Sequence, residues 1–413
     1  KWSRLWSAQG GCGPTFWTDD RCGDTPHGAQ TRPVNATNDN KDMKNLNFLS
    51  KALCLITMLM ICRTAAEAAS GGDGNELRVA VAGVAHGHLN DIISRMDRGD
   101  FKVVGVWEKD DRMRRDNGLI RHDSTIPAFD DLGEMLDTTR PEAVVAYGPI
   151  YDHMEVVEAC APRGIHVMVE KPLAVNNRHA RRMAKLARKH GILLLTNYET
   201  SWYSSNHEAY RMVKDGIIGD ITRILVYDGH QGPIEIGCGK DFTTWLTDPV
   251  MNGGGAITDF GCYGANLATW LFGGRKPLSV YAVTNSQKPG KYPKVDDDAT
   301  IILQYPDVTV QLMPSWNWPM NRKDMYVYGS KGYIYQSAPS RMSLYRNGKE
   351  SDVKPTPLEA PYDDSFRYLK AAVRGEIKVN ATDLASLENN LTVVEILDAA
   401  VKSARKGKPV RLR

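Results

Sequence analysis

Short apolar segments that alternate with amphipathic helical segments constrain the fold of this chain more than any other feature. The apolar segments span residues 77–83, 101–107, 143–146, 166–169 and 192–195. Apolar residues at helical spacing lie between them, over 86–98, 152–163 and 176–190. Strands that are apolar on both faces and separated by helices are typical of a parallel sheet covered on both sides. We therefore predict a doubly wound α/β domain over residues 76–196, with ligands bound beyond the carboxyl ends of its strands.

The sequence from residue 197 onwards has the character of an antiparallel sheet. Gly, Pro, Asp or Lys-Gly turns separate six β-type segments, at 221–227, 278–284, 299–305, 308–313, 325–328 and 333–336. Helical patterns flank these segments at 264–271, 365–374 and 382–404. The sequence therefore predicts an α+β domain over residues 197–413, with an open, mainly antiparallel sheet that has one face free for partners.

The start of the chain differs from the rest. Residues 1–42 show no periodicity, and we interpret them as an upstream or non-native segment. Residues 43–68 have a basic start, an apolar run from Ala52 to Cys62, and an end rich in alanine. These parts predict a cleavable signal peptide that begins at Met43, since the apolar run is too short to cross a bilayer. We expect an exported protein, periplasmic or secreted, without a stable membrane anchor; a buried N-terminal helix is the alternative.

Charge and cysteine content exclude some classes of protein. The net charge of +3, from 52 basic and 49 acidic residues, gives no basic excess that would suggest binding of nucleic acid. Only Cys160, Cys238 and Cys262 follow the predicted signal peptide. A bridge between Cys238 and Cys262 is possible in an oxidising compartment. The Cys and His spacing of zinc sites is absent after residue 68, so we expect no metal.

The loop after the first apolar segment has the sequence GVAHGH, from Gly83 to His88. Its small residues Gly83, Ala85 and Gly87 let the backbone approach a pyrophosphate at a helix N-terminus, although the loop departs from the G-x-G-x-x-G pattern. Glu108 closes the second apolar segment, 25 residues after Gly83, where an acid can accept a hydrogen bond from a ribose 2′-hydroxyl. These residues favour NAD over NADP; a tight turn and an exposed strand-end charge are the alternatives.

A lysine ends the fourth apolar segment, in the run Glu170-Lys171-Pro172. This position faces the ligand crevice, and a lysine there is costly to desolvate without a function. We expect Lys171 to hold a substrate hydroxyl and to stabilise its alkoxide during hydride loss. A surface pair of Glu170 with Lys171 is the alternative.

The run GGGAITDFGCYGAN, over residues 253–266, carries the second chemical signal. Asp259 and Tyr263 are four residues apart and share one face if the segment is helical. Asp259 could orient a sugar hydroxyl, and Tyr263 could exchange the substrate proton if Lys171 or the nicotinamide charge lowers its pKa. A helix cap and a packed aromatic ring are the structural alternative.

In this order and spacing, the loop, the E-K-P strand end and the GGGxxxDxGxY run resemble the Gfo/Idh/MocA oxidoreductase family. The Tyr263–Asn266 run looks like its glucose–fructose oxidoreductase and dihydrodiol dehydrogenase branch, whereas many members have His in place of Tyr263. Further similar segments are Gly148-Pro149 with His153, VDDDAT at 295–300 and GKPV at 407–410.

The resemblance implies a Rossmann domain that binds NAD or, less favoured here, NADP, and a second domain whose open sheet forms homodimers or homotetramers. It assigns Lys171 as the family's E-K-P lysine and Asp259 as its substrate-binding aspartate. By the same resemblance, further cofactor contacts are expected from His86, His88, Gly148, Pro149, His153 and Glu170.

Family members mostly transfer a hydride to or from a hydroxyl or ketone of sugars and polyols, and a second set cleaves glycosides with NAD that stays bound. Free NAD is scarce outside the cytoplasm, so an exported member needs a tightly bound cofactor. Aromatic and polar groups suited to a sugar are expected at Asn197, His230 and Trp245, beside Asp259 and Tyr263. A non-catalytic exported binding protein of the same fold is the alternative from another class.

Overall fold

The computed structural model of the chain describes residues 75–412. The expected upstream segment 1–42 and the expected signal peptide 43–68 lie outside the described residues, so both stay predictions. Within residues 75–412, none of the helices combines the length and the apolar content that a bilayer span requires.

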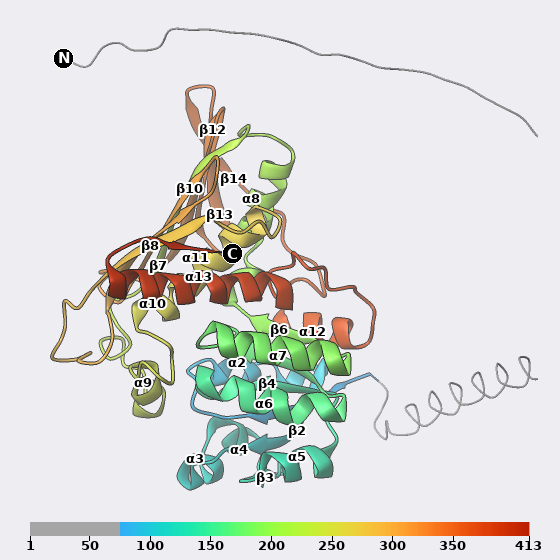
Figure 1. Cartoon of the computed structure of the whole chain (residues 1–413). Helices are drawn as coiled ribbons and strands as arrows, with labels where there is room; N and C mark the ends of the chain where they lie inside the picture. Colours follow the sequence, from blue (N-terminus) through green and yellow to red (C-terminus); the bar gives the residue numbers. More distant parts are fainter. Residues whose placement is uncertain (1–74, 413) are drawn as a thin grey trace, which may run out of the picture. The chain divides into compact units, whose positions relative to one another are not determined.

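The first domain is built on a six-stranded parallel sheet with the strand order β3-β2-β1-β4-β5-β6 (Figure 1). Its strands are β1 (Leu77–Ala82), β2 (Phe101–Trp107), β3 (Ala128–Phe129), β4 (Ala143–Ala146), β5 (His166–Glu170) and β6 (Leu194–Asn197). Five of these strands lie where the apolar segments predict them. The doubly wound α/β fold is therefore confirmed, and the carboxyl ends of the strands meet at one edge of the sheet.

The helices of this domain are α2 (Leu89–Ile93), α3 (Asp111–Arg115), α4 (Gly118–His122), α5 (Leu132–Thr139), α6 (His153–Cys160) and α7 (Asn177–His190). The expected single helix over 86–98 is wrong, because α2 ends at Ile93 and a separate 3₁₀ turn follows at Met96–Arg98. The carbonyl of Asp91 accepts bonds from the side chains of Ser94 and Arg95, at 3.0 and 2.7 Å. The carbonyl therefore does not accept the backbone N–H bond that a longer helix would need at this position.

The second domain is built on a nine-stranded sheet with the order β14-β13-β12-β11-β7-β10-β9-β8-β15. Its strands are β7 (Ile221–Gly229), β8 (Ser279–Asn285), β9 (Asp298–Gln304), β10 (Thr309–Ser315), β11 (Arg322–Gly329), β12 (Gly332–Ala338), β13 (Arg341–Arg346), β14 (Lys349–Val353) and β15 (Val410–Arg411). Only β7 and β10 pair in parallel. The expected open, mainly antiparallel sheet is confirmed, with three more strands at its edges than the sequence indicates.

Helices cover one face of this sheet, where α11 and α13 pack against β7, β8 and β10. The helices of the second half of the chain are α8 (Ser204–Lys214), α9 (Lys240–Leu246), α10 (Ala256–Asp259), α11 (Gly261–Leu271), α12 (Ser365–Val373) and α13 (Leu387–Lys406). The last helix begins at Leu387 and not at residue 382, because the Ser386 side chain caps it by accepting from Asn389 N.

One segment assigned by sequence to the second domain packs on the first. Phe366 of α12 stacks on Phe101 of β2 with ring centroids 4.3 Å apart. Asp364 accepts hydrogen bonds from Arg95 and Arg98 at 2.6 and 2.9 Å. The chain therefore passes from the first domain to the second near residue 197, as predicted from the sequence. It then returns to the first sheet with α12, before α13 begins.

Candidate active site

The end of β1 and the loop after β4 form a close backbone contact that only glycine permits. Gly83 has φ +82°, and a Cβ atom there would lie 2.5 Å from the backbone nitrogen of Gly148. Gly83 and Gly148 line a cavity of about 260 Å³ at the carboxyl ends of β1, β2 and β4. Predicted cofactor residues that line it are Gly83, Ala85, Glu108, Gly148, Pro149 and His153.

Glu108 fits the ribose-binding role predicted for it. Its carboxylate accepts hydrogen bonds from the backbone nitrogens of Val84 and Asp110, each at 3.0 Å. A carboxylate has about four acceptor positions, so acceptor capacity remains for a ligand hydroxyl. The adjacent Lys109 points to Glu155, with its Nζ 2.5 Å from Oε2.

His153 lines the same cavity and has an unpartnered buried nitrogen. Its Nδ1 lies 3.2 Å from the carbonyl oxygen of Leu173, which can only accept, so Nδ1 carries the proton. Its Nε2 is buried without a partner in the described part of the chain, and burial lowers the pKa of His153 to about 4. A neutral histidine with a free acceptor fits a ligand that donates, such as a hydroxyl or amide of a dinucleotide.

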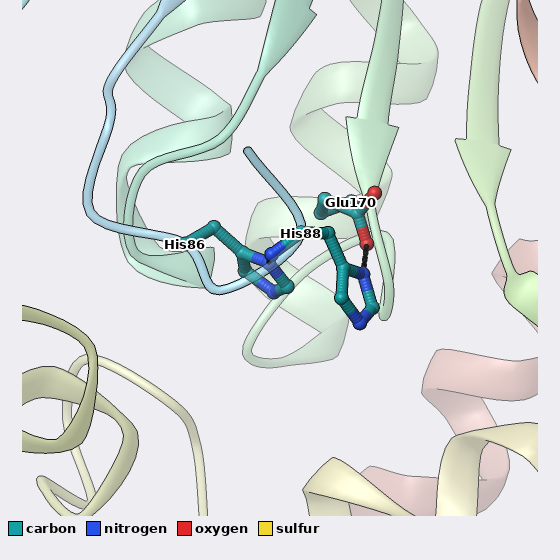
Figure 2. A group of neighbouring side chains, drawn as sticks. All are labelled: His86, His88 and Glu170. Atoms are coloured by element: carbon teal, nitrogen blue, oxygen red, sulfur yellow. Dashed lines mark hydrogen bonds and ion pairs between the residues drawn. The ribbon is translucent and has the colours of Figure 1, made fainter. Parts of the chain in front are cut away.

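A buried carboxylate lies behind the loop that follows β1, and Figure 2 shows it with its neighbours His86 and His88. Glu170 accepts from Nδ1 of His88 at 3.0 Å and from Nδ2 of Asn197 at 2.9 Å. Burial opposes ionisation of Glu170, but the charge and hydrogen bond of His88 outweigh it and hold the pKa of Glu170 at about 2. Asn197 also accepts from Trp202 at 3.1 Å, so its amide orients Glu170, and the substrate role expected of it stays a prediction.

His86, His88 and Glu170 offer metal-ligating atoms that all lie within 4.8 Å of one another. In a tetrahedral zinc site the ligand atoms lie about 2.1 Å from the ion and therefore about 3.4 Å from one another. A spacing of up to 4.8 Å between the three side chains does not by itself define such a site. His88 is engaged with Glu170, and Nδ1 of His86 accepts from the backbone nitrogen of His88 at 3.1 Å. The three side chains therefore form an ion pair with a supporting histidine.

Lys171, the next residue, belongs to a separate network. Its Nζ donates to Oδ1 of Asp259 at 2.6 Å and to the Asp259 carbonyl at 3.1 Å, and the Lys171–Pro172 peptide bond is cis. Oδ2 of Asp259 accepts from Nε1 of Trp316 at 2.9 Å. Burial opposes the charge of each partner, yet their attraction lowers the pKa of Asp259 and raises that of Lys171. The structure thus brings together two of the three predicted catalytic residues as a buried ion pair.

Tyr263 lies beside this pair, although the helix that was expected to carry it is interrupted. α10 ends at Asp259 and α11 begins at Gly261. The Tyr263 ring centroid is 5.1 Å from Nζ of Lys171 and 5.0 Å from Nζ of Lys323. Burial, with Glu199 and other acidic neighbours, raises the pKa of Tyr263 well above its usual value. Lys171 therefore does not provide the lowering of the pKa that was the condition for proton exchange by Tyr263, and the hydroxyl is neutral.

His230 lines a second cavity, of about 630 Å³, together with Phe260, the residue that follows Asp259 and whose ring centroid lies 4.9 Å from that of His230. Its Nδ1 accepts from the backbone nitrogen of Gly232 at 2.9 Å, so the neutral ring carries its proton on Nε2. Burial lowers the pKa of His230, which keeps that form. Other polar or aromatic residues lining the cavity are Glu199, Tyr203, Phe260, Lys323 and Arg341.

Lys323 and Trp316 belong to the site but were not predicted from the sequence. Trp245 was predicted at the substrate but lines the other cavity. Lys323, which pairs with Glu199, lies in a polar stretch that resembles a turn, and Trp316 directly follows the last residue of β10. Their contacts depend on the pairing of β11 with β7 and on the end of β10, which no local pattern reveals. Trp245, expected at the substrate, lines the dinucleotide cavity with its ring 5.7 Å from His86.

The cysteines do not form the possible bridge. Cys160, Cys238 and Cys262 are all free thiols. Cys262 is buried in α11, where its Sγ lies 3.2 Å from the Asp259 carbonyl.

Comparisons with known proteins agree with this architecture. Residues 77–198 match the family described as "Oxidoreductase family, NAD-binding Rossmann fold", and residues 206–335 match "GFO/IDH/MocA C-terminal domain". Trans-1,2-dihydrobenzene-1,2-diol dehydrogenase of Xenopus laevis is 27% identical over 321 residues, which cover 75% of this chain and 92% of that protein. The Homo sapiens enzyme of the same name is 25% identical over 302 residues, covering 69% and 82%.

Solved structures share the fold at lower identity. Aldose-aldose oxidoreductase from Caulobacter crescentus, complexed with glycerol, has a TM-score of 0.70 and 21% identity, and the match covers 82% of this chain and 100% of that one. The WlbA dehydrogenase from Bordetella pertussis, in complex with NADH and UDP-GlcNAcA, has a TM-score of 0.67 and 19% identity, covering 82% and 99%.

The chain therefore belongs to the Gfo/Idh/MocA family of oxidoreductases, and its first domain is an NAD-binding Rossmann domain. The resemblance predicted from the E-K-P lysine, the aspartate and the glycine loop is confirmed.

Proposed function

We propose that this protein is an NAD-dependent dehydrogenase that acts on a hydroxyl or ketone of a sugar or polyol. The observation that carries the proposal is the buried Lys171–Asp259 pair, at 2.6 Å, in which Lys171 directly follows the last residue of the Rossmann strand β5. NAD, when bound, accepts the hydride or, once reduced, returns it. Names of relatives and fold neighbours, which include a diol dehydrogenase and an aldose oxidoreductase, support this substrate class.

In this proposal each polar group has one task. Lys171 holds the substrate oxygen and stabilises its negative charge, while Asp259 keeps the ammonium charged and in place. In the direction of reduction, the neutral Tyr263 gives its hydroxyl proton to that oxygen, because an alkoxide is a stronger base than a phenolate even when the pKa of the phenol is raised, and Nε2–H of His230 donates a hydrogen bond to the substrate. Glu108 accepts from the ribose and repels a 2′-phosphate, so NAD is preferred over NADP.

The test begins with the purified full chain. Mass spectrometry of ligands released on denaturation should detect NAD, and NADH should form when sugars or polyols are supplied. Lys171→Met should lower kcat about 10²- to 10³-fold, as loss of one charge-stabilising group does, while NAD remains bound. Lys109→Met, at an exposed lysine beside the cofactor cavity, is the control and should keep kcat.

Other outcomes identify the alternatives. Reducing sugar released from a glycoside without net NADH would favour a glycosidase that oxidises its substrate transiently. Folded protein that binds no dinucleotide would overturn both enzymatic proposals and leave a non-catalytic binding protein. Full turnover by Lys171→Met would remove the lysine from its proposed task.

We further propose that the protein is exported and that its signal peptide is cleaved near residue 68. An exported enzyme would have to keep its NAD tightly bound, since free NAD is scarce outside the cytoplasm. The proposal rests on the sequence pattern of residues 43–68. N-terminal sequencing of protein recovered outside the cytoplasm checks it, and an uncleaved chain retained inside would contradict it.

A second copy of the chain is the partner we propose for the face of the large sheet that no helix of residues 75–412 covers. Met325 and Val327 of β11 are buried under the helices, so the alternating Tyr326 and Tyr328 lie on the other face. The stacked tyrosines of this face are Tyr326, Tyr328, Tyr333, Tyr335 and Tyr345. Such aromatic surfaces are enriched at interfaces, and light scattering should give the mass of a dimer or tetramer.

A further inference from the structure

Three consecutive aspartates, Asp296, Asp297 and Asp298, lie at the start of β9 and have different partners. Asp296 binds the segment that leads into α10. Its Oδ1 accepts from the backbone nitrogen of Gly255 at 2.9 Å, and its Oδ2 accepts from that of Ile257 at 2.7 Å. Its own carbonyl accepts from the nitrogen between them, that of Ala256, at 3.0 Å. One residue therefore holds three successive N–H groups at the start of the four-residue helix that ends at Asp259.

Glycine is required for this contact. A Cβ atom on Gly255 would lie 1.8 Å from the carbonyl oxygen of Asp296, closer than any side chain allows. The glycine run before α10, whose purpose the sequence leaves open, thus lets the Asp296 backbone pack directly on the helix start.

Asp297 binds the segment on the other side of Asp259. Its carbonyl accepts from the backbone nitrogen of Trp316 at 2.8 Å, and its Oδ1 accepts from Nδ2 of Asn317 at 2.9 Å. Trp316 is fully buried and donates from Nε1 to Asp259. The backbone of Asp259 is therefore held through Asp296, and its carboxylate is held through Asp297 and Trp316.

We propose that Asp296 and Asp297 are positioning residues that hold Asp259 against Lys171 from two sides and so fix the ammonium that serves catalysis. The assignment rests on the proposed function, because it deepens the role of the same site. Asp298 serves as the internal comparison, since its Oδ2 accepts from the side chain of Asn285 at 3.2 Å on the neighbouring strand.

The protonation state of the Asp296 side chain should affect how firmly Asp259 is held. Burial, and to a smaller extent the charge of Asp297, raise the pKa of Asp296 to about 6, against the opposing effect of the N–H groups of Gly255 and Ile257. Lys294 and Arg405 line the cavity next to it. Once protonated, one oxygen becomes a donor and can no longer accept from an N–H group. Because the folded-state pKa is raised, protonation of this group favours the folded state, so positioning can be lost without unfolding.

The first measurement does not depend on activity. Full-length wild type, Asp296→Asn, Trp316→Phe and the matched control Asp298→Asn are labelled with acetic anhydride, and acetylation of Lys171 is read by mass spectrometry of its peptide. A drop of one unit in the pKa of Lys171 raises its reactive neutral fraction about tenfold. We expect about that increase in Asp296→Asn and Trp316→Phe, and none in Asp298→Asn.

The second measurement is the pH profile of kcat. Wild type and Asp298→Asn should lose activity as the pH falls through about 6, while circular dichroism shows a folded chain. Asp296→Asn should have a kcat about tenfold lower at pH 7.5, unchanged affinity for NADH, and no acid limb from this group. Equal Lys171 labelling in all four proteins would overturn the positioning role. Changed labelling in a protein that oxidises no sugar or polyol would overturn the proposed function instead.

Discussion

Glu170 and Asp259 are two buried carboxylates with similar environments and different partners. Glu170, 1% exposed, faces the cofactor loop and binds His88 and Asn197. Asp259, 4% exposed, is the last residue of α10 and binds Lys171 and Trp316. Each accepts from one charged and one neutral donor. However, the cation beside Asp259 is permanent and 6% exposed, whereas the one beside Glu170 is a histidine whose side chain is 31% exposed.

In the proposed function, this difference separates the tasks of the adjacent residues Glu170 and Lys171. A fixed, dry positive charge suits the stabilisation of an oxyanion, because no solvent screens it. A partly exposed histidine instead makes the cofactor side sensitive to pH. The alternative in which Glu170 pairs with Lys171 on the surface is excluded, since both side chains are buried and bind different partners.

Removing each carboxylate should give the largest difference between the two networks. Asp259→Asn leaves the ammonium of Lys171 buried without its partner, and we expect a loss of about 3–5 kcal/mol in the free energy of unfolding. Glu170→Gln leaves a histidine that can become neutral, so the loss should be about 1–2 kcal/mol. Urea unfolding at pH 7 measures both.

The control for these two variants is Asp241→Asn, which removes an exposed pair with Arg112. Its effect should stay below about 0.5 kcal/mol. Equal losses in Asp259→Asn and Glu170→Gln would show that the two carboxylates are energetically alike and that the comparison is wrong.

Tyr263→Phe sharpens the comparison on the substrate side. The ring contacts with Lys171 and Lys323 remain, and only the hydroxyl is lost. We expect kcat to fall about 10²-fold, at the lower end of the range for general acid catalysis, with little change in KM. Tyr305→Phe, at a buried tyrosine that packs on Phe272, is the matched control. Equal kcat in wild type and Tyr263→Phe would show that this hydroxyl donates no proton.

The smallest effect is expected from the titration of His88. Attraction to Glu170 outweighs burial and raises its pKa above the usual value of 6.5. The pair therefore adds stability that is complete below about pH 6.5 and is lost as the pH rises through the folded-state pKa. The free energy of unfolding of wild type minus that of His88→Gln should fall by about 1 kcal/mol or less between pH 6 and pH 9, since solvent screens the exposed edge. A constant difference would mean that His88 does not titrate in this range.

The sequence predicts the strands and the chemical residues of this molecule better than it predicts their partners. The strands β1, β2, β4, β5 and β6 are built mainly of apolar residues on both faces, so their burial shows in the sequence alone. β14 is exposed along most of its length and carries no alternation that could mark it. Its place depends on pairing with β13, a contact that the sequence pattern does not contain.

The same limit applies to the site. Lys171 and Asp259 stand in motifs and could be predicted, as could Glu108 and Gly83. Asn197 stands at the end of a strand as a ligand group would, but the fold directs its amide to Glu170. The shift in the pKa of Tyr263 could not be predicted. Its direction depends on how deeply the ring is buried and not on the charges near it in sequence.

The return of the chain to the first sheet has a consequence for how the protein is made. Phe366 and Leu369 belong to the same apolar cluster as Leu77 and Phe101, almost three hundred positions earlier in the chain. During synthesis from the N-terminus, this cluster cannot close until α12 has left the ribosome. The cofactor-binding half therefore completes its core late, and a fragment that stops at residue 196 would leave an apolar surface of that sheet open to water.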